Sequence, residues 1–285
     1  IDATLNDDGT ARTLLYSGYH RTPTEIEKKH NTYETDLGAS IGWHQGTLHI
    51  NANAVYTRYD RSLQPMQNAL YHTYSAQGNS FLNMSLDYGW NNHRWAFSGE
   101  TALNKKGSVA LIHTVNCRVT DQLSLMLLHR YYDKRYTAQH ANSFREGSSI
   151  QNEHGIYLGA TWQPLRSWFV QGYVDYAHFS WPRYQVSASS DAFDALFSAR
   201  YSRKRWKWNM RYRMHIRQHD NDTKKLIVNQ RSHRLRIAVD WTTTSTLTLR
   251  TQGDGVVVSE QGTNSRGIMI GQQARWQQRW LKVAA

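Results

Sequence analysis

Residues Trp206 to Arg217 read WKWNMRYRMHIR, and they alternate without exception between large apolar or aromatic side chains and polar, mostly cationic ones. Successive side chains of a β-strand point to opposite faces of a sheet, whereas a helix would mix the two sets around its circumference. The stretch therefore predicts a strand with one apolar face and one basic face.

The same period-two pattern recurs along most of the chain. It is clear in four further segments and weaker in eight others. The clear segments are Leu48 to Tyr56, Leu82 to Trp90, Trp168 to Tyr176 and Arg234 to Trp241. The weaker ones are Leu37 to Trp43, Trp95 to Thr101, Val109 to Val119, Leu123 to Tyr131, Ile156 to Trp162, Phe193 to Tyr201, Leu247 to Thr251 and Ile268 to Trp276. With Thr13 to Tyr19 counted, the sequence predicts about 14 antiparallel strands.

The connections between these segments alternate in length. Short ones include His44 to Gly46, Asn91 to His93 and Thr243 to Ser245, and the connection Lys105 to Gly107 is brief where a long one is due. Long polar connections are Asp60 to Asn79, Lys134 to Asn152, Pro182 to Ser190 and Gln218 to Arg231. Short turns on one side and long loops on the other are typical of outer-membrane barrels. We therefore predict an all-β fold, an antiparallel transmembrane β-barrel formed by residues 1–285 as a single domain.

A soluble β-sandwich is the alternative, because it would alternate too. It seldom places tryptophan or tyrosine at the end of nearly every apolar stripe, since its apolar faces form a core. Here aromatic residues end most stripes beside the short connections, as in the girdle of a membrane interface. They are Trp43, Trp90, Trp95, Trp162, Trp168, Trp206, Trp241 and Trp276, and Tyr56 is an aromatic stripe residue away from those turns.

Composition excludes several other classes. The chain has 285 residues with a mean hydropathy of −0.71, and no apolar run approaches the roughly 18 residues that a membrane-spanning helix needs. Its 11 Trp and 17 Tyr are too many for a disordered chain. Cys117 is the only cysteine, which excludes an internal disulfide and a cysteine-based zinc site. Ile1 to Leu14 lacks the pattern of an export signal, and we expect that the sequence is cut at both ends.

Three stretches carry a resemblance to a known family: Tyr19 to Lys29, Asn142 to Gly159 and Val174 to Tyr184. They resemble the barrel region of outer-membrane proteins of Bacteroides-type bacteria that carry helix-hairpin-helix modules before the barrel. The resemblance implies a periplasmic module preceding Ile1, which would hold a nucleic-acid backbone, and closing strands after Ala285. No helix-hairpin-helix segment occurs in this sequence, so the resemblance assigns nucleic-acid binding to none of its residues.

Many of the basic residues lie on the polar face of the predicted strands. Formal net charge is +12, from 34 Lys plus Arg against 22 Asp plus Glu. An Arg or Lys facing lipid costs about 2–4 kcal/mol at mid-bilayer, so in a barrel these residues face the lumen. The predicted basic lumen residues are Arg118, Arg130, Arg200, Lys207, Arg211, Arg213, Arg217, Arg234, Arg236, Arg250 and Arg275. The predicted acidic ones are Asp36, Asp87, Glu100, Asp175, Asp194 and Asp240.

Two interpretations of this lumen stay open. A focused positive potential would make it a conduit for anions such as phosphates or nucleotides. Alternatively, the acidic residues pair with the arginines in a structural network that fills a narrow barrel. Stacking of nucleic-acid bases on Trp206 and Trp208 beside Lys207 is disfavoured, because rings and cations alternate between opposite faces.

Catalysis and metal binding have little support in the sequence. His113 and His129 lie on the lipid parity, which is reminiscent of outer-membrane lipases, yet no serine is placed distinctively beside them. His215 and His219 would lie about 13 Å apart on one face of a strand, too far to share a metal. We predict no enzymatic activity, no cofactor and no metal site.

The long connection from Ala141 to Asn152 is where specific function is expected, because loops carry most binding residues. An ordered cap that satisfies its own polar groups is the equal alternative. The candidate residues are Phe144, Arg145, Glu146, Gln151, Asn152 and Glu153.

Taken together, these patterns predict an outer-membrane barrel of a Gram-negative bacterium that binds or conducts anionic cargo. The alternative is a structural or docking subunit with a plugged lumen. Expected partners are outer-membrane lipid and lipopolysaccharide and other outer-membrane proteins, with nucleic acid implied only by the resemblance.

Overall fold

The computed structural model describes residues 1–221, 223, 226–278 and 281–284. Thirteen long strands follow one another in chain order, and each pairs antiparallel with the next. They are β3 (Glu34–Gln45), β4 (Leu48–Leu63), β5 (Gly78–Asn91), β6 (Trp95–Asn104), β7 (Val109–Arg118), β8 (Leu123–Tyr132), β9 (Glu153–Trp162), β10 (Trp168–Phe179), β11 (Ser190–Arg203), β12 (Trp206–Asp220), β13 (Ile227–Thr242), β14 (Leu247–Glu260) and β15 (Thr263–Gln278). The short β16 (Leu281–Ala284) pairs with the end of β15. The predicted all-β, antiparallel fold is confirmed.

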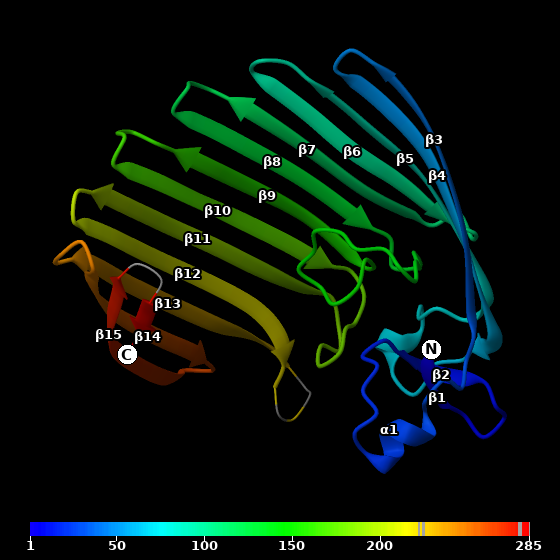
Figure 1. Ribbon diagram of the computed structural model, residues 1–285. Helices are drawn as coiled ribbons and strands as arrows, with labels where there is room; N and C mark the ends of the chain where they lie inside the picture. Colours follow the sequence, from blue (N-terminus) through cyan, green and yellow to red (C-terminus); the bar gives the residue numbers. More distant parts are fainter. Residues whose placement is uncertain (222, 224–225, 279–280, 285) are drawn as a thin grey trace.

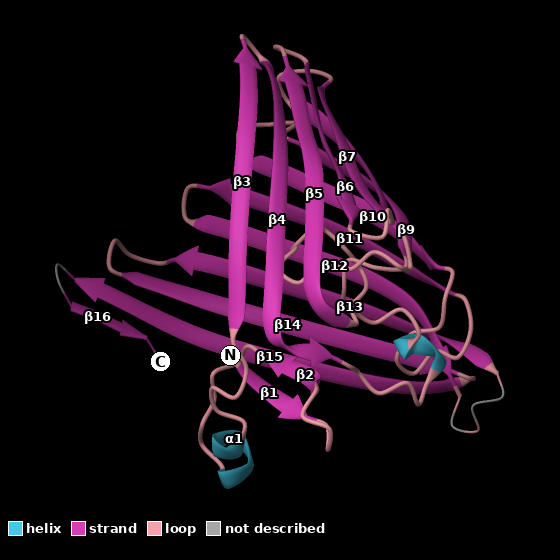
Figure 2. Ribbon diagram, turned by 90° about the vertical axis from the view of Figure 1, so that its right-hand side faces the viewer, coloured by secondary structure: helices cyan, strands magenta, loops and turns pink. Residues whose placement is uncertain are grey.

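The sheet is a curved and twisted trough (Figure 1). When the molecule is turned by 90°, β3 to β5 run upright in the view while β13 to β15 run across it (Figure 2), as the right-handed twist accumulates from strand to strand. Among the described residues β3 pairs only with β4, and no strand joins β3 to β15 or β16, so the sheet stays open between its two edges.

The strand registers give the sheet two chemically different faces. We call the face that carries Trp208, Met210 and Tyr212 the outer face, and the face that carries Asn209, Arg211 and Arg213 the inner face. Pairing in register puts Leu125, Leu127, Leu158, Val174 and Phe197 on the outer face, where each is 41–52% exposed. All the predicted basic and acidic lumen residues lie on the inner face by the same registers.

The eight tryptophans of the predicted girdle all lie on the outer face near the short turns. Several pack against aromatic neighbours on the adjacent strand: Trp206 stacks on Trp241 at a centroid distance of 5.5 Å, and Trp168 contacts Tyr201 at 5.1 Å. Cross-strand aromatic pairs of this kind stabilise the pairing of adjacent strands at their short-turn ends.

The amino-terminal segment corrects one prediction. The expected strand Thr13 to Tyr19 is instead β2 (Ala11–Leu15), which forms a small hairpin with β1 (Asp2–Leu5) and, among the described residues, pairs with a long strand only at Ala11 and Leu63. Ala3 and Ala11 are fully buried against Tyr59 and Phe81 at the long-loop end of β4 and β5. The local sequence of a short strand does not determine which strand it pairs with.

Two helical turns lie outside the sheet. α1 (Pro23–Glu27) begins at Thr22, whose side chain caps the N–H of Glu25 while the Glu25 carboxylate accepts from the Thr22 N–H. η1 (Leu70–His72) lies in the connection between β4 and β5. In the described part of the chain, no helix is long and apolar enough to cross a membrane.

The loop lengths agree with the prediction at the short-turn end and depart from it at the other end. β14 and β15 meet in a two-residue turn, Gln261-Gly262, where both residues have positive φ, as tight hairpins require. The sequence pattern stops at Thr251 because Gly253 and Gly255 interrupt the apolar face. The backbone of both glycines nevertheless pairs with β15, so β14 continues to Glu260. Likewise, β12 ends only at Asp220 and β13 already begins at Ile227. The connection between them is therefore much shorter than the predicted one, Gln218 to Arg231.

Gly155 on β9 provides a test of packing on the inner face. It lies directly opposite Arg130, and a Cβ atom added to it would lie 2.5 Å from Arg130 Cζ. We expect Gly155→Ala to lower the unfolding free energy by about 1–3 kcal/mol, because the Arg130 guanidinium is packed too tightly to move.

Gly271→Ala on β15 is the matched control, since it also adds a methyl group to an inner-face strand glycine but meets nothing within 4 Å. Urea unfolding followed by tryptophan fluorescence measures both. Equal effects of the two substitutions would contradict the packing argument.

Candidate functional site on the inner face

The connection between β8 and β9, residues 133–152, folds back over the inner face, and we call it the inner loop (Figure 1). Asn83 on β5 donates to Thr137 O over 2.9 Å, and Asn104 on β6 donates to Arg135 O over 2.9 Å. The hydroxyl of Tyr132 donates to Phe144 O over 2.7 Å. The inner loop is therefore fixed to side chains of several strands and does not extend away from the sheet.

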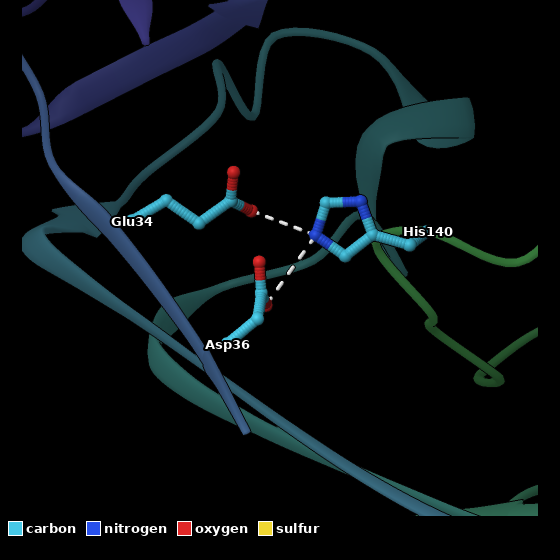
Figure 3. Close-up of side chains that lie close together, drawn as sticks. All are labelled: Glu34, Asp36 and His140. Carbon is cyan, nitrogen blue, oxygen red and sulfur yellow. Dashed lines mark hydrogen bonds and ion pairs between the residues drawn. The ribbon is translucent and has the colours of Figure 1, made fainter. Parts of the chain in front are cut away.

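One anchor of the inner loop lies on β3. His140 Nε2 is 2.8 Å from Glu34 Oε1 and 3.5 Å from Asp36 Oδ1, two residues of the same strand face (Figure 3). The Tyr59 hydroxyl donates to Glu34 over 2.6 Å, and the Thr57 hydroxyl donates to Asp36 over 2.6 Å. These bonds orient both carboxylates toward the imidazole.

A second anchor lies on the opposite side of the trough, on β11 and β12. His215 Nε2 is 3.6 Å from Glu146 Oε1, and His215 Nδ1 is 3.2 Å from Asp194 Oδ2. Asp194 is buried and also forms an ion pair with Arg213. Burial raises the pKa of the Glu146 carboxyl. The inner loop thus reaches from β3 to β12 across the inner face.

A buried charge network lies between the two anchors. Arg130 Nε donates to Glu153 over 2.5 Å and Arg130 Nη1 donates to Asp175 over 2.7 Å, and Arg130 is fully buried. Glu153 also accepts from the backbone N–H groups of Gly147, over 2.7 Å, and Glu146, over 2.9 Å. One carboxylate therefore joins the guanidinium to the inner loop. Arg130 and Asp175 belong to this covered network and not to an accessible charged surface.

The predicted loop residues have structural contacts. The ring of Phe144 lies 5.0 Å from the Arg130 guanidinium, and Arg145 donates to Asn142 over 2.9 Å. Gln151 donates to Tyr74 O, and Asn152 exchanges hydrogen bonds with the Trp181 backbone. Glu153 is the first residue of β9, so placing it in the loop was wrong. Contacts of this kind are those of an ordered cap.

Four arginines lie close together on the inner face of β12 and β13, and we call them the basic wall. They are Arg211, Arg213, Arg234 and Arg236. The register places Arg211 opposite Arg236 and Arg213 opposite Arg234. Arg213 pairs with Asp194, and Arg236 pairs with Asp254 over 2.5 Å, whereas no ion pair of Arg211 or Arg234 is found among the described residues. A hollow of about 570 Å³ is lined by the four arginines together with Asp254 and mostly apolar residues of β13 to β15.

The other predicted lumen residues show that charge is unevenly distributed. Nine of the eleven predicted basic residues lie on β11 to β15, whereas four of the six predicted acidic residues lie on β3 to β10. Among the remaining contacts, Arg250 lies 3.7 Å from Asp240, Arg217 donates to Gln230, and Asp87 accepts from Asn51 and Asn53. Arg118, Arg200, Lys207, Glu100 and Arg275 lie on the inner face without an ion pair among the described residues. Hence most of the predicted basic residues on β11 to β15 form no ion pair with an acidic residue among the described residues.

Glu34, His140 and His215, which anchor the inner loop, were not among the predicted site residues. Glu34 and His140 are 106 positions apart and belong to a strand and a loop that the local pattern treats separately. His215 appeared only as a partner of His219, which in the structure lies 3.3 Å from Glu260 instead. In the described part of the chain, two groups of side chains bring possible metal-ligand atoms close together. They are Glu34, Asp36 and His140, and Glu146, Asp194 and His215.

Comparisons with known proteins find no matching family model and no matching curated protein. Among solved structures, the chain is similar to the NanC porin, with 14% identity over 67% of this chain and 91% of that one and a TM-score of 0.30. It is also similar to the FrpB iron transporter from Neisseria meningitidis, with 10% identity, a TM-score of 0.38 and 89% of this chain covered. The chain spans 58% of the length of that transporter.

The raised pKa of Glu146 predicts how stability depends on pH. An acid whose pKa is higher in the folded state contributes stability below its ordinary value of 4.5, and this contribution is lost as the pH rises through the folded pKa. Glu146→Gln stays neutral at every pH, so its stability relative to wild type should increase as the pH rises from 4 to 8.

Urea unfolding at a series of pH values measures this difference. Arg145→Gln is the control, since it changes the neighbouring loop charge and leaves the Glu146 carboxyl in place. A Glu146→Gln difference that does not vary with pH would show that burial does not disfavour the Glu146 carboxylate.

Proposed function

We propose that the chain forms part of the wall of a bacterial outer-membrane β-barrel and that its inner face binds and conducts small anionic solutes. One observation carries the proposal: Arg211 and Arg234 lie on the open inner face, in register with two further arginines, and have no ion pair among the described residues. Like charges placed opposite one another destabilise a sheet unless an anion lies between them.

The outer face supports the membrane part of the proposal. Large apolar side chains are exposed on strand after strand of this face, which soluble monomers rarely tolerate as one continuous patch. Strands β6 to β9 have 10 residues each, a length that crosses a bilayer when tilted. The tryptophans near the short turns form a band of the kind that lies at a membrane interface.

The inner face supports the conduction part. A wall of one charge sign, beside low-dielectric material, raises the local concentration of oppositely charged solutes. The inner loop covers the inner face from β3 as far as His215 on β12, whereas the arginines of β13 lie beyond its anchors. The inner loop would therefore narrow the path and force solutes to pass along the basic wall.

A docking or structural subunit with a plugged lumen is the second candidate. The observation that favours it is the inner loop itself, since its candidate side chains are held by hydrogen bonds and ion pairs on several strands. Nucleic acid is one class of anion that the basic wall would attract, and the resemblance to helix-hairpin-helix proteins is the reason to include it in the tests below.

Bilayer conductance tests the basic wall. We expect the complete barrel to which this chain contributes part of the wall, inserted in planar bilayers, to show anion-selective openings. Arg211→Gln with Arg234→Gln should lower its anion-to-cation permeability ratio at least about twofold, because focused charge sets this ratio. Added DNA should reduce the current only if the path also admits nucleic acid.

The matched control is Arg231→Gln with Arg266→Gln, which removes two charges from the outer face. An equal change of selectivity in both double variants would contradict the proposed role of the basic wall. Silence from correctly inserted protein would favour the plugged barrel.

Substitutions on the two faces test the membrane orientation. Leu158→Arg places a cation on the outer face and should cost about 2–4 kcal/mol of stability in lipid vesicles, because the charge then faces hydrocarbon. Ser85→Arg places a cation on the inner face, two positions from Asp87 on the same side of β5, and should lower stability little. Unfolding in urea from vesicles measures both. If Leu158→Arg were as harmless as Ser85→Arg, the outer face would not contact lipid.

A further inference from the structure

The outer face carries histidines on four successive strands, and the proposed conduction uses none of them. They are His113 on β7, His129 on β8, His154 on β9 and His178 on β10. His113 is directly opposite His129, and His154 is directly opposite His178. Between β8 and β9 the row steps by two residues, because His129 is opposite Ile156 and His154 is opposite Tyr131. A row of imidazoles is unexpected on a face that is otherwise rich in leucine, valine and tryptophan.

The two ends of the row have other partners. The Tyr88 hydroxyl lies 2.7 Å from His113 Nε2, and His178 Nδ1 lies 2.9 Å from Asp191 Oδ1. In the middle, His129 Nε2 lies 3.1 Å from His154 Nε2. Among the described residues neither central imidazole has a carboxylate partner, although the His129 ring stacks on His113 at a centroid distance of 6.0 Å. The central pair is thus left with two nitrogen atoms facing each other.

The separation of these atoms suits a shared metal ion. Two imidazole nitrogens bound to one tetrahedral zinc, at about 2.0–2.1 Å each, lie about 3.3–3.4 Å apart. A shift of a few tenths of an ångström would bring His129 and His154 to that distance. Imidazole ligands without carboxylates favour zinc, nickel and copper over calcium and magnesium.

We infer that His129 and His154 form a binding site for a divalent transition-metal ion on the outer face. Water completes the coordination, because His154 is the second residue of β9 and His129 lies three residues before the end of β8. At about 3.3 Å per residue, both lie within about 10 Å of the long-loop end, a depth that the water and headgroup region of a membrane reaches. Metal binding here needs the folded sheet and does not depend on conduction.

The two groups that combine carboxylates with histidine on the inner face are weaker candidates. Glu34 and Asp36 each already accept a hydroxyl hydrogen bond, and Asp194 is paired with Arg213, whose positive charge repels a cation. These groups are explained as anchors of the inner loop. Their histidines, His140 and His215, nevertheless provide the best control substitutions, because each lies close to two carboxylates that could also bind a metal.

The test uses the full chain folded in detergent micelles at pH 7.5. Zinc titration by calorimetry should show one ion per chain bound through the outer-face pair, and copper loaded at one equivalent should show two nitrogen ligands by electron paramagnetic resonance. His129→Ala and His154→Ala should each weaken zinc binding at least about tenfold, the scale of loss that even an outer-shell partner causes.

The control variant His140→Ala with His215→Ala should retain the site, as should His93→Ala in a short turn. Circular dichroism confirms folding, and His129→Gln with His154→Gln provides a second pair of variants with side chains of similar size. Zinc binding that is unchanged in the two alanine variants and in His129→Gln with His154→Gln, or absent up to millimolar zinc in folded wild type, would overturn the inference.

Discussion

The buried guanidinium of Arg130 determines the arrangement of the inner face. It is held by Glu153 and Asp175 on the two strands that follow, and Glu153 in turn accepts the backbone N–H groups of Glu146 and Gly147. Removing one partner of a buried ion pair typically costs about 3–5 kcal/mol, because a charge is then left uncompensated. The three strands and the inner loop are therefore coupled, and the loop cannot leave the sheet without exposing the network.

This coupling gives the two sides of the trough different roles. On the side of β3 to β10, acidic residues, asparagines and the inner loop satisfy one another. On the side of β11 to β15, the cations exceed the acids, and Arg211 and Arg234 stay unpaired among the described residues. On the proposed function, the first side supports the constriction and the second attracts the solute. The outer-face histidines are separate from both, since their registers place them on the opposite surface.

Much of the fold follows from the sequence because alternation is a local property. Trp206 to Arg217 and the similar segments fix which side chains share a face, and the observed registers place every predicted lumen residue on one face. What the sequence could not give depends on contacts between distant segments. His140 meets Glu34 only because the inner loop folds back over the sheet, and Arg130 is buried only because that loop covers it. The β2 strand shows the same limit, since its local sequence does not determine its pairing partner.

The central claim is that the inner face lines a water-filled path while the outer face contacts lipid. Cysteine accessibility tests it most directly. In a Cys117→Ser background, single cysteines at Asn209 on the inner face and Leu158 on the outer face can be treated with an anionic, membrane-impermeant thiol reagent in vesicles. The account predicts rapid modification of Asn209→Cys and protection of Leu158→Cys. Protection of Asn209→Cys together with modification of Leu158→Cys would contradict it.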